Sequence, residues 1–456
     1  MPSRKQRNPR TRKERNEQTA KEYWLEQCAA YFDDLKSAAQ NAPRGQVLNY
    51  VEAAVIEQGH ELIRQSLETL IQDEIDEVEK KNETRECPKC SQKKRHLGYR
   101  SKEIFSARGP IKLERLYDEC RPCRLLEHAV DEILGLDTKY TVGARRLIVR
   151  AGGAKAFAEA KEDLLEYCQL DISHMTIREI CQQEAVKMEA WQATASSEIA
   201  KDFIDAAGNV EVTMDGTSVN TMEGYKEVKI GINSKREFAD SALPEEWGDR
   251  KLPRHTARVA FAAIEDREAF QKRMNDWRRR LHLGATGDIS TLGDGAPWIW
   301  NISLAVYGPV RENLDIYHAL EHLSDTSKVL YGKGTDTQKQ WYEEATLELL
   351  SGGFEGVEPR LQRAEKEKEW GKEQKENLRL LRGYLESNRK RLCYRQRLAE
   401  GRAIGSGQVE GACKNMIGVR LKQTGARWQV PRLNRMTVIC SVRYSSHWKK
   451  YWAQAA

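Results

Sequence analysis

Four cysteines lie in two pairs with the spacing of a metal site. Each pair has the pattern Cys-x2-Cys, with Cys87 and Cys90 in the first and Cys120 and Cys123 in the second. Two such pairs brought together offer four thiolates in a tetrahedron, which is the ligand set of structural Zn²⁺. Disulfide bonds are the alternative, but a reducing compartment disfavours them. The sequence therefore predicts a zinc site at these four residues.

Two strand-like runs, residues 99–106 and 111–117, lie between the cysteine pairs and are joined through Gly109-Pro110. A hairpin between two cysteine pairs is what a zinc ribbon uses to bring its ligands together. We therefore expect a zinc ribbon over residues 84–128. The other six cysteines show no spacing pattern and are expected to be structural thiols: Cys28, Cys168, Cys181, Cys393, Cys413 and Cys440.

Two aspartates follow strand-like runs and precede a glycine. Asp215 ends an alternating run from Val210, and Asp294 follows the run 289–293. Asp-Gly is a common pair in turns, so either aspartate alone could simply stabilise a turn. If the two strands are neighbours, however, carboxylates at their ends can converge. Asp288 is an alternative to Asp294, and the residues that flank Asp294 favour the latter.

A third carboxylate, Glu410, stands alone in a basic region. It is the only acid among residues 401–456, which contain ten lysines or arginines. A helix capped by Ser406 would hold it near its first turn. An ion pair with Lys414, four residues on, is the plainer role. Together, Asp215, Asp294 and Glu410 could instead hold two Mg²⁺ ions for phosphodiester cleavage.

The elements around these acids predict a mixed α/β fold. Strands are expected over 210–215, 228–232, 257–264 and 289–293, with a helix that begins at Asp266 between the last two. Strand, strand, strand, helix, strand is the order of a mixed sheet rather than of a helical bundle.

Composition and charge limit the class of protein. The chain has 456 residues, a net charge of +6 and 32% charged residues. It contains no run of about 20 apolar residues, so we do not expect a membrane protein. Its basic N-terminus lacks the apolar core of a secretory signal, and we expect a cytoplasmic protein.

The basic strip at 401–456 is typical of a surface that binds a polyanion. Its aromatic residues could stack on unpaired bases, although a basic helix with core aromatics is the simpler alternative. The predicted DNA-binding residues are Lys414, Arg420, Lys422, Arg427 and Trp428.

Four strings of residues, in this order, resemble those of the ISKra-type bacterial insertion-sequence transposases, members of the DDE group. They are Met214-Asp215-Gly216-Thr217, residues 293–300 (GDGAPWIW), residues 314–322 (LDIYHALEH) and residues 404–414 (IGSGQVEGACK). The resemblance runs from the zinc pairs to about Trp428. It implies a ribonuclease H-like core in which Asp215, Asp294 and Glu410 hold Mg²⁺ or Mn²⁺, and an enzyme that cuts transposon ends and joins them to target DNA.

Asp315-Ile316-Tyr317-His318 also resembles the C/D-x2-H motif of several DDE transposase groups. The resemblance implies that His318 contacts DNA or the scissile phosphate and that Asp315 orients it. The alternative is a helix that Asp315 caps, with His318 and His322 on one face. These histidines have the spacing for zinc, but no third ligand is apparent.

The expected organisation has six parts. Residues 1–80 are expected to contain a disordered basic arm (about residues 1–20) and a helical region, and residues 84–128 the zinc ribbon. A helical region with helix-turn-helix character is expected at 137–195. The catalytic core is expected in two parts, the first at 205–330 and its final helix, with the basic C-terminal region, at 399–456, with a helical insertion at 331–398 between them. A small helical bundle is the alternative for 137–195, where Ser173 is expected to cap a helix.

The predicted function is a DNA transposase that binds duplex DNA, both the terminal inverted repeats and the target, as a homo-oligomer associated with the bacterial nucleoid. A zinc-containing DNA-binding regulator and a metal-dependent nuclease without strand transfer are the alternatives.

Overall fold

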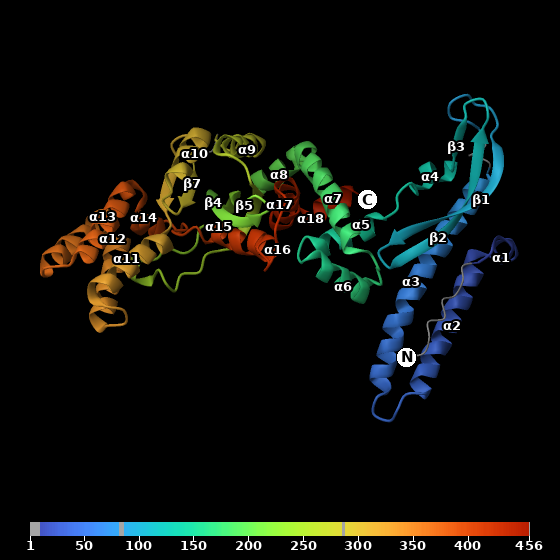
Figure 1. Cartoon of the computed structure of the whole chain (residues 1–456), viewed down its shortest axis with the longest axis horizontal. Coiled ribbons are helices and arrows are strands. Elements are labelled where there is room, and N and C mark those ends of the chain that lie inside the picture. Colours follow the sequence, from blue (N-terminus) through green and yellow to red (C-terminus); the bar gives the residue numbers. More distant parts are fainter. Residues whose placement is uncertain (1–9, 82–85, 285–287, 456) are drawn as a thin grey trace. The chain divides into compact units, whose positions relative to one another are not determined.

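The protein is described by a computed structural model that covers residues 10–81, 86–284 and 288–455. It divides into two compact units, Met1–Cys181 with Ala455–Ala456, and Gln182–Gln454 (Figure 1). Each unit contains a β-sheet with helices, so the expected mixed α/β class is confirmed. No helix in the described part of the chain is both long and apolar enough to cross a membrane.

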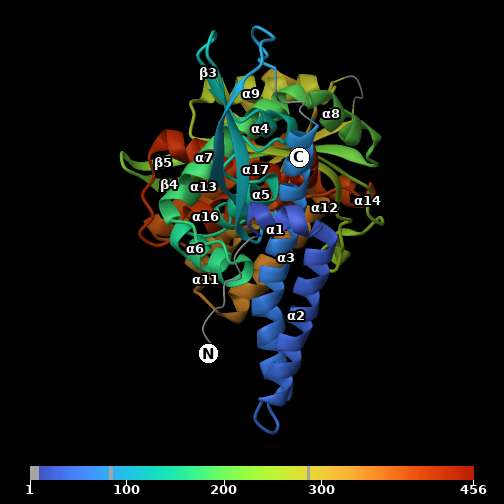
Figure 2. The ribbon, with the colours of Figure 1, turned by 90° about the vertical axis from the view of Figure 1, so that its right-hand side faces the viewer.

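The first unit contains a hairpin of two long helices, α2 (Ala20–Gln40) and α3 (Val47–Lys80). Figure 2 shows them side by side along the length of α2. Thr19 begins α2 with a capping box that it forms with Glu22. The indole of Trp24 donates to the hydroxyl of Ser66 (2.6 Å), which ties the two helices together. The helical pattern predicted from Lys21 onward is therefore confirmed.

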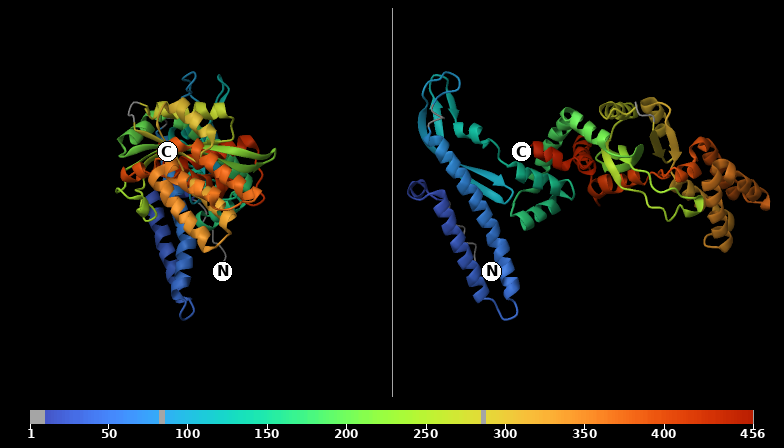
Figure 3. Two further views of the ribbon diagram at one scale, coloured as in Figure 1. Left: turned by 90° about the vertical axis from the view of Figure 1, so that its left-hand side faces the viewer. Right: turned by 180° about the vertical axis from the view of Figure 1, so that it is seen from behind.

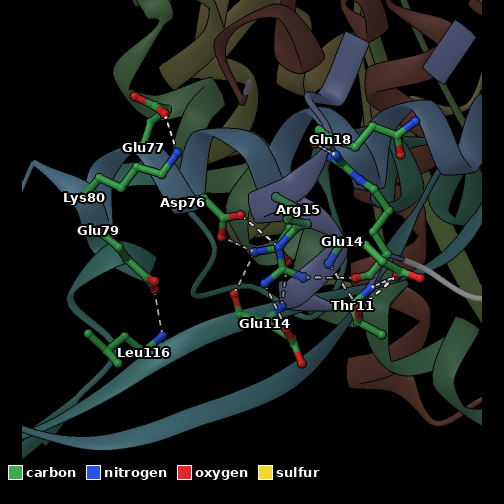
Figure 4. Close-up of polar contacts among 12 residues, drawn as sticks. Thr11, Glu14, Arg15, Gln18, Asp76, Glu77, Glu79, Lys80, Glu114 and Leu116 are labelled. Carbon is green, nitrogen blue, oxygen red and sulfur yellow. Dashed lines mark hydrogen bonds and ion pairs between the residues drawn. The ribbon is translucent and has the colours of Figure 1, made fainter. Parts of the chain in front are cut away.

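The predicted disordered arm is wrong for part of its length. Residues Arg12–Glu17 form helix α1, which Thr11 and Glu14 cap reciprocally. Arg4, Lys5 and Arg7 lie outside the described residues. Figure 4 shows why the segment is ordered: the guanidinium of Arg15, only 5% exposed, donates to Asp76 of α3 (2.8 Å) and to Glu114 (2.9 Å).

A three-stranded antiparallel sheet completes the framework of this unit. Its strands are β1 (Arg95–Ser106), β2 (Gly109–Cys120) and β3 (Leu125–Glu127), in the order β1-β2-β3. The edge of β2 that β3 does not cover has backbone N–H groups without a strand partner among the described residues. Side-chain oxygens of helix α3 accept hydrogen bonds from these groups at alternate positions. The pairs are Glu68 with Lys112, Gln72 with Glu114 and Glu79 with Leu116, each 2.8 Å.

Four helices follow the sheet: α4 (Ala129–Leu134), α5 (Val142–Gly152), α6 (Phe157–Cys168) and α7 (His174–Thr194). The predicted cap is confirmed, because the Ser173 hydroxyl accepts from the N–H of Thr176 (3.1 Å) at the start of α7. A helix-turn-helix role for α6 and α7 stays a prediction.

The second unit is built on a five-stranded mixed sheet in the order β6-β5-β4-β7-β8. The strands are β4 (Asn209–Thr221), β5 (Gly224–Arg236), β6 (His255–Ala263), β7 (Ile289–Gly293) and β8 (Arg311–Leu314). Strands β4, β5 and β6 are antiparallel neighbours, whereas β7 runs parallel to β4 and β8 parallel to β7. Four of the five strands were predicted, and β8 was not.

One strand boundary was predicted incorrectly. Asp215 does not end a strand, because β4 continues for six more residues to Thr221, where it pairs with Gly224 in a tight hairpin. Pairing with β5 is what extends the strand past Gly216. On the other side, pairing with β7 extends only as far as Thr213, so Asp215 lies where the parallel neighbour ends.

Helices surround the sheet: α8 (Ser196–Asp205), α9 (Arg267–Arg280), α10 (Pro297–Tyr307) and α11 (Ile316–Tyr331). Asp266 caps α9 as expected (2.8 Å to the N–H of Ala269). The helical insertion contains α12 (Asp336–Glu367), which bends at Gly353, followed by α13 (Lys372–Ser387) and α14 (Tyr394–Ala399). Figure 3 shows the orange helices gathered at one end of this unit. Trp341 and Trp370 are buried in its core.

The C-terminal segment returns to the sheet through α15 (Gly407–Ala412), a π-helical turn (Cys413–Gly418), α16 (Val419–Leu421), α17 (Val430–Tyr444) and α18 (Trp448–Gln454). Two side chains of this segment accept hydrogen bonds from backbone N–H groups in or next to β6. Asn434 of α17 accepts from Ile264, and Ser445, which follows α17, accepts from Ala260 (2.8 Å each). Tyr451 and Trp452 are buried, which corrects their suggested role as base-stacking residues.

We expect Arg15→Met to lower the free energy of unfolding of the first unit by about 1–3 kcal/mol, because it leaves Asp76 and Glu114 without their shared donor. Thermal unfolding followed by circular dichroism measures this. Lys13→Met is the matched control, because Lys13 is 85% exposed and its pairing with Glu17 spans 3.9 Å. Equal stability of both variants would contradict the prediction.

Candidate active site and zinc site

The register of two parallel strands brings Asp215 and Asp294 together. In the β4–β7 pairing, Thr213 lies opposite Leu292. Two positions further along each chain are Asp215 and Asp294, so the aspartates occupy matching places on neighbouring segments. The charge of Asp294 contributes to the pKa of Asp215, which agrees with their being close.

Asp294 is held by a tight turn. Its carboxylate accepts from the N–H of Ala296 (2.9 Å), and its carbonyl accepts from the hydroxyl of Tyr384 in α13 (2.9 Å). Gly295 has a φ of +101°, and a Cβ there would lie 3.1 Å from the Tyr384 ring. This turn therefore requires glycine. The contact with Tyr384 links the helical insertion directly to the candidate site.

Glu410 is brought to the same end of the sheet by α15. The side chain of Gln408 accepts from the hydroxyl of Ser234 on β5 (2.8 Å), and its carbonyl accepts from Tyr444 of α17 (3.0 Å). One turn beyond Glu410, the thiol of Cys413 donates to Asp215 (3.1 Å). Cys413 was predicted to be a structural thiol, and this contact shows that its structural partner is Asp215.

Asp315 is a buried carboxylate that connects three elements. Its backbone N–H donates to the carbonyl of Gly293 at the end of β7 (2.8 Å). One carboxylate oxygen caps α11 at the N–H of Tyr317 (2.6 Å), and the other accepts from both the N–H and the hydroxyl of Ser406, just before α15. The expected cap is thus present, but Ser406 binds Asp315 instead of capping its own helix.

His318 lies in the first turn of α11 and faces Glu410. Its Nε2 is 3.8 Å from the Glu410 carboxylate, and its Nδ1 is 3.5 Å from Glu321. The ring is about one-third exposed. His322 instead stacks on Tyr384, with ring centroids 4.1 Å apart. His318 is therefore the histidine of this helix that lies beside the acids.

Asp288 lies at the opposite end of β7 from Asp294. It comes just before Ile289, where the strand begins, and it accepts from Arg402 (2.8 Å) with Arg311 at 3.5 Å. The arginine contacts of Asp288 and its position at the other end of β7 favour Asp294 as the neighbour of Asp215.

The electrostatics of the site suit a cation. Burial raises the pKa of Asp215, the nearby charge of Asp294 raises it further, and hydrogen bonds from Cys413 and Gly216 only partly offset these effects. Among the described residues, neither Asp215 nor Asp294 has an ion-pair partner of opposite charge. Carboxylates brought together in this way match the oxygen ligands that Mg²⁺ prefers.

The three acids lie near one another but do not form a closed ligand set. Asp215 accepts from Cys413, which directly follows the helix that carries Glu410. His318 lies 3.8 Å from Glu410, and its charge also lowers the pKa of Asp215. In the described part of the chain, only the four cysteines discussed below have ligand atoms all within 4.8 Å of one another.

The predicted DNA-binding residues divide into two groups. Lys414, Lys422 and Arg427 are exposed. Arg420 is 3% exposed and its guanidinium lies over the ring of Trp428, 4.9 Å from the centroid. Trp428 is half-buried, and its backbone pairs with β4 near Thr221. Arg420 is therefore a packing residue in this structure, which corrects its assignment as a phosphate contact.

The zinc ligands predicted from the cysteine spacing lie together. The sulfur atoms of Cys87, Cys90, Cys120 and Cys123 all lie within 4.8 Å of one another, so they could hold a metal ion such as Zn²⁺. The residue after each pair, Ser91 and Arg124, has a positive φ (56° and 51°), so both loops turn in the same way.

Backbone amides prepare this cluster for a cation. The N–H of Lys89 donates to the Cys87 sulfur (3.4 Å). Burial raises the pKa of Cys87, but hydrogen bonds from the backbone of Lys89 and Cys90 and from neighbouring thiols bring it down to about 7. In the absence of metal, the same thiol contacts raise the pKa of Cys123, and that of Cys120 is also raised. A four-thiol set fits Zn²⁺, which requires deprotonated ligands.

Cys120→Ser should remove bound zinc and lower the melting temperature of the first unit, because the last residue of β2 is then no longer tied to the loop before β1. Zinc content by mass spectrometry and thermal unfolding test this. Cys393→Ser is the control, since Cys393 is exposed and outside the cluster. Full zinc content in Cys120→Ser would contradict the assignment.

Asp215→Asn should stabilise the second unit at neutral pH in the absence of divalent ions. Because the folded pKa of Asp215 is raised, its contribution to stability falls as the pH rises through the window between its unfolded and folded pKa values. The advantage of asparagine should therefore disappear in acid. Asp288→Asn should instead lower the stability of the second unit at neutral pH, since it loses ion pairs with Arg402 and Arg311. Urea unfolding at both pH values measures the two variants.

The chain was compared with known proteins. A scan against protein-family models finds no match, and a search of curated proteins finds no significant relative.

Proposed function

We propose that this protein is a DNA transposase of the DDE group, with its catalytic core in the second unit. The observation that carries the proposal is the β4–β7 register, which aligns Asp215 with Asp294, together with the Cys413 contact that holds the Glu410 helix beside Asp215. In this proposal, the three carboxylates come from distant parts of the chain and act together beside the exposed Lys414 and Lys422.

The sheet supports a ribonuclease H-like core. Its order is β6-β5-β4-β7-β8, with three antiparallel strands followed by two parallel ones. The resemblance implies a core in which two of the acids lie on strands and the third lies on a helix. Asp215 on β4, Asp294 directly after β7 and Glu410 on α15 correspond to this arrangement.

Asp215, Asp294 and Glu410 would hold the metal. When bound, a pair of Mg²⁺ ions stabilises both the attacking and the leaving oxygen of an in-line displacement at phosphorus. All three acids are partly buried, and burial raises the pKa of Asp215. His318 is one-third exposed and 3.8 Å from Glu410, and in this proposal it would contact a phosphate of the DNA.

The reaction has two steps at phosphorus. First, water attacks the phosphodiester at the transposon end, and the bond to the 3′ oxygen breaks to leave a free 3′-hydroxyl and a 5′-phosphate. Next, that hydroxyl attacks a phosphodiester of the target, forming one bond as another breaks. No side chain becomes linked to DNA, so a trapped protein–DNA adduct would exclude the scheme.

The exposed cations of the C-terminal segment would bind the DNA backbone. Lys414 and Lys422 lie on the turns that follow Glu410, and Lys422 also contacts the hydroxyl of Thr217 on β4. Contacts between lysines and phosphates position the duplex without reading its sequence. Recognition of the element's ends then rests with the first unit, where the zinc ribbon and the α5–α7 helices are candidates.

We expect Asp294→Asn to abolish cleavage, at least about a thousandfold, while binding of the same DNA is retained. Asp288→Asn is the matched control and should cut normally, because Asp288 lies at the other end of β7. The assay uses Mg²⁺ and DNA that carries the chromosomal segments flanking the gene.

Two results of that assay would count against the proposal. Equal loss in both variants would point to folding, and normal cutting by Asp294→Asn would refute the assigned site. Cut DNA that is never joined to a target plasmid would indicate a nuclease without strand transfer. Binding without any cutting by the wild type would indicate a regulator.

A further inference from the structure

The α2–α3 hairpin carries an uncovered apolar face. Its large side chains repeat every seven residues, with Leu25 and Phe32 on α2 and Ile56, Ile63 and Leu70 on α3. They are 52%, 65%, 56%, 52% and 61% exposed, respectively. Exposed apolar side chains at a seven-residue interval are typical of a helix that packs against another helix with the same repeat.

These residues share one face of the hairpin. The helices touch along a line through the Trp24–Ser66 hydrogen bond and the approach of Tyr31 to Gly59. On α2, Leu25 and Phe32 each follow a contact residue (Trp24 and Tyr31) by one position, which is a rotation of about 100° around the helix. On α3, Ile56 and Ile63 each precede a contact residue (Gly59 and Ser66) by three positions, which is a rotation of about 60° in the same sense. Because the helices are antiparallel, the same sense of rotation leads to the same side.

The other side of α3 is already used. Glu68 and Gln72 accept from the backbone of β2, and Ile75 is buried with Ile111 and Leu113 of that strand. These residues point away from the face of Ile56 and Ile63. Within the first unit, the sheet therefore covers one side of the hairpin, and the face with the seven-residue repeat remains exposed.

We propose that this face binds the same face of a second copy of the chain, forming a four-helix bundle across a twofold axis. A second copy supplies a surface with the same repeat and the same length, as a twofold interface requires. The large side chains at the repeat positions are all apolar, so the surface suits another apolar face rather than a polyanion.

The area is sufficient for a stable dimer. The 21 residues of α2 span about 31 Å. Two helices side by side are about 20 Å wide, so each copy offers roughly 600 Å², and the pair would bury about 1,200 Å². That exceeds the roughly 1,000 Å² expected of a specific interface. Neither metal nor DNA takes part, so the inference stands independently of the proposed activity.

The test is the molar mass of the full-length protein in solution without DNA, measured by sedimentation equilibrium over a range of concentrations. We expect a dimer for the wild type. Ile56→Ser combined with Ile63→Ser should raise the dimer dissociation constant at least about a hundredfold, since the exchange removes four isoleucines from the interface. Both residues are exposed, so the monomer should keep its fold, which circular dichroism verifies.

Tyr50→Ser is the matched control. Tyr50 is 46% exposed on the same helix but on the opposite face, and the dimer should persist. A monomeric wild type would overturn the proposal. It would be the result if another part of the same chain covered the face. A dimer that the double variant leaves intact would show that association uses a different surface.

Discussion

The parallel pairing of β4 with β7 is the constraint on which the candidate site depends. It aligns two aspartates that are remote in the sequence, and it does so against their mutual repulsion. Since side chains alternate between the faces of a strand, a slip of one residue would send Asp294 to the opposite face from Asp215. The buried residues of β7 on both faces oppose such a slip, because every one of its positions is enclosed.

The features that could be predicted from the sequence are those set by local chemistry. The cysteine spacing identified four residues that lie together and could hold a metal ion such as Zn²⁺. Asp266 and Ser173 were recognised as caps because capping involves residues only three positions apart. The alternation of residues 210–215 and 228–232, which predicted β4 and β5, was equally local. What failed was set by distant partners. β4 runs past Asp215 because β5 pairs with it, and Arg420 is buried because Trp428 folds back over it.

The contacts that complete the candidate site were similarly out of reach. Cys413 had no partner in its own neighbourhood, and only the return of the chain to the sheet brings its thiol to Asp215. Tyr384 belongs to an insertion whose pattern indicated packing alone. Asp315 was expected to serve His318, yet both of its oxygens are used by backbone and hydroxyl groups of Tyr317 and Ser406. These roles could be predicted only from information about which residues lie close together in the fold. A single sequence does not contain that information.

The order of the acids along the chain has a consequence for synthesis on the ribosome. The zinc ribbon and the helices of the first unit are translated before Asp215, whereas Glu410 and the α17 helix that satisfies β6 come almost at the end. The N-terminal modules can therefore fold while the carboxylate trio is still incomplete. A nascent or prematurely terminated chain that lacks the last fifty residues would retain the four-cysteine cluster but would lack Glu410 and the α17 side chains that satisfy β6.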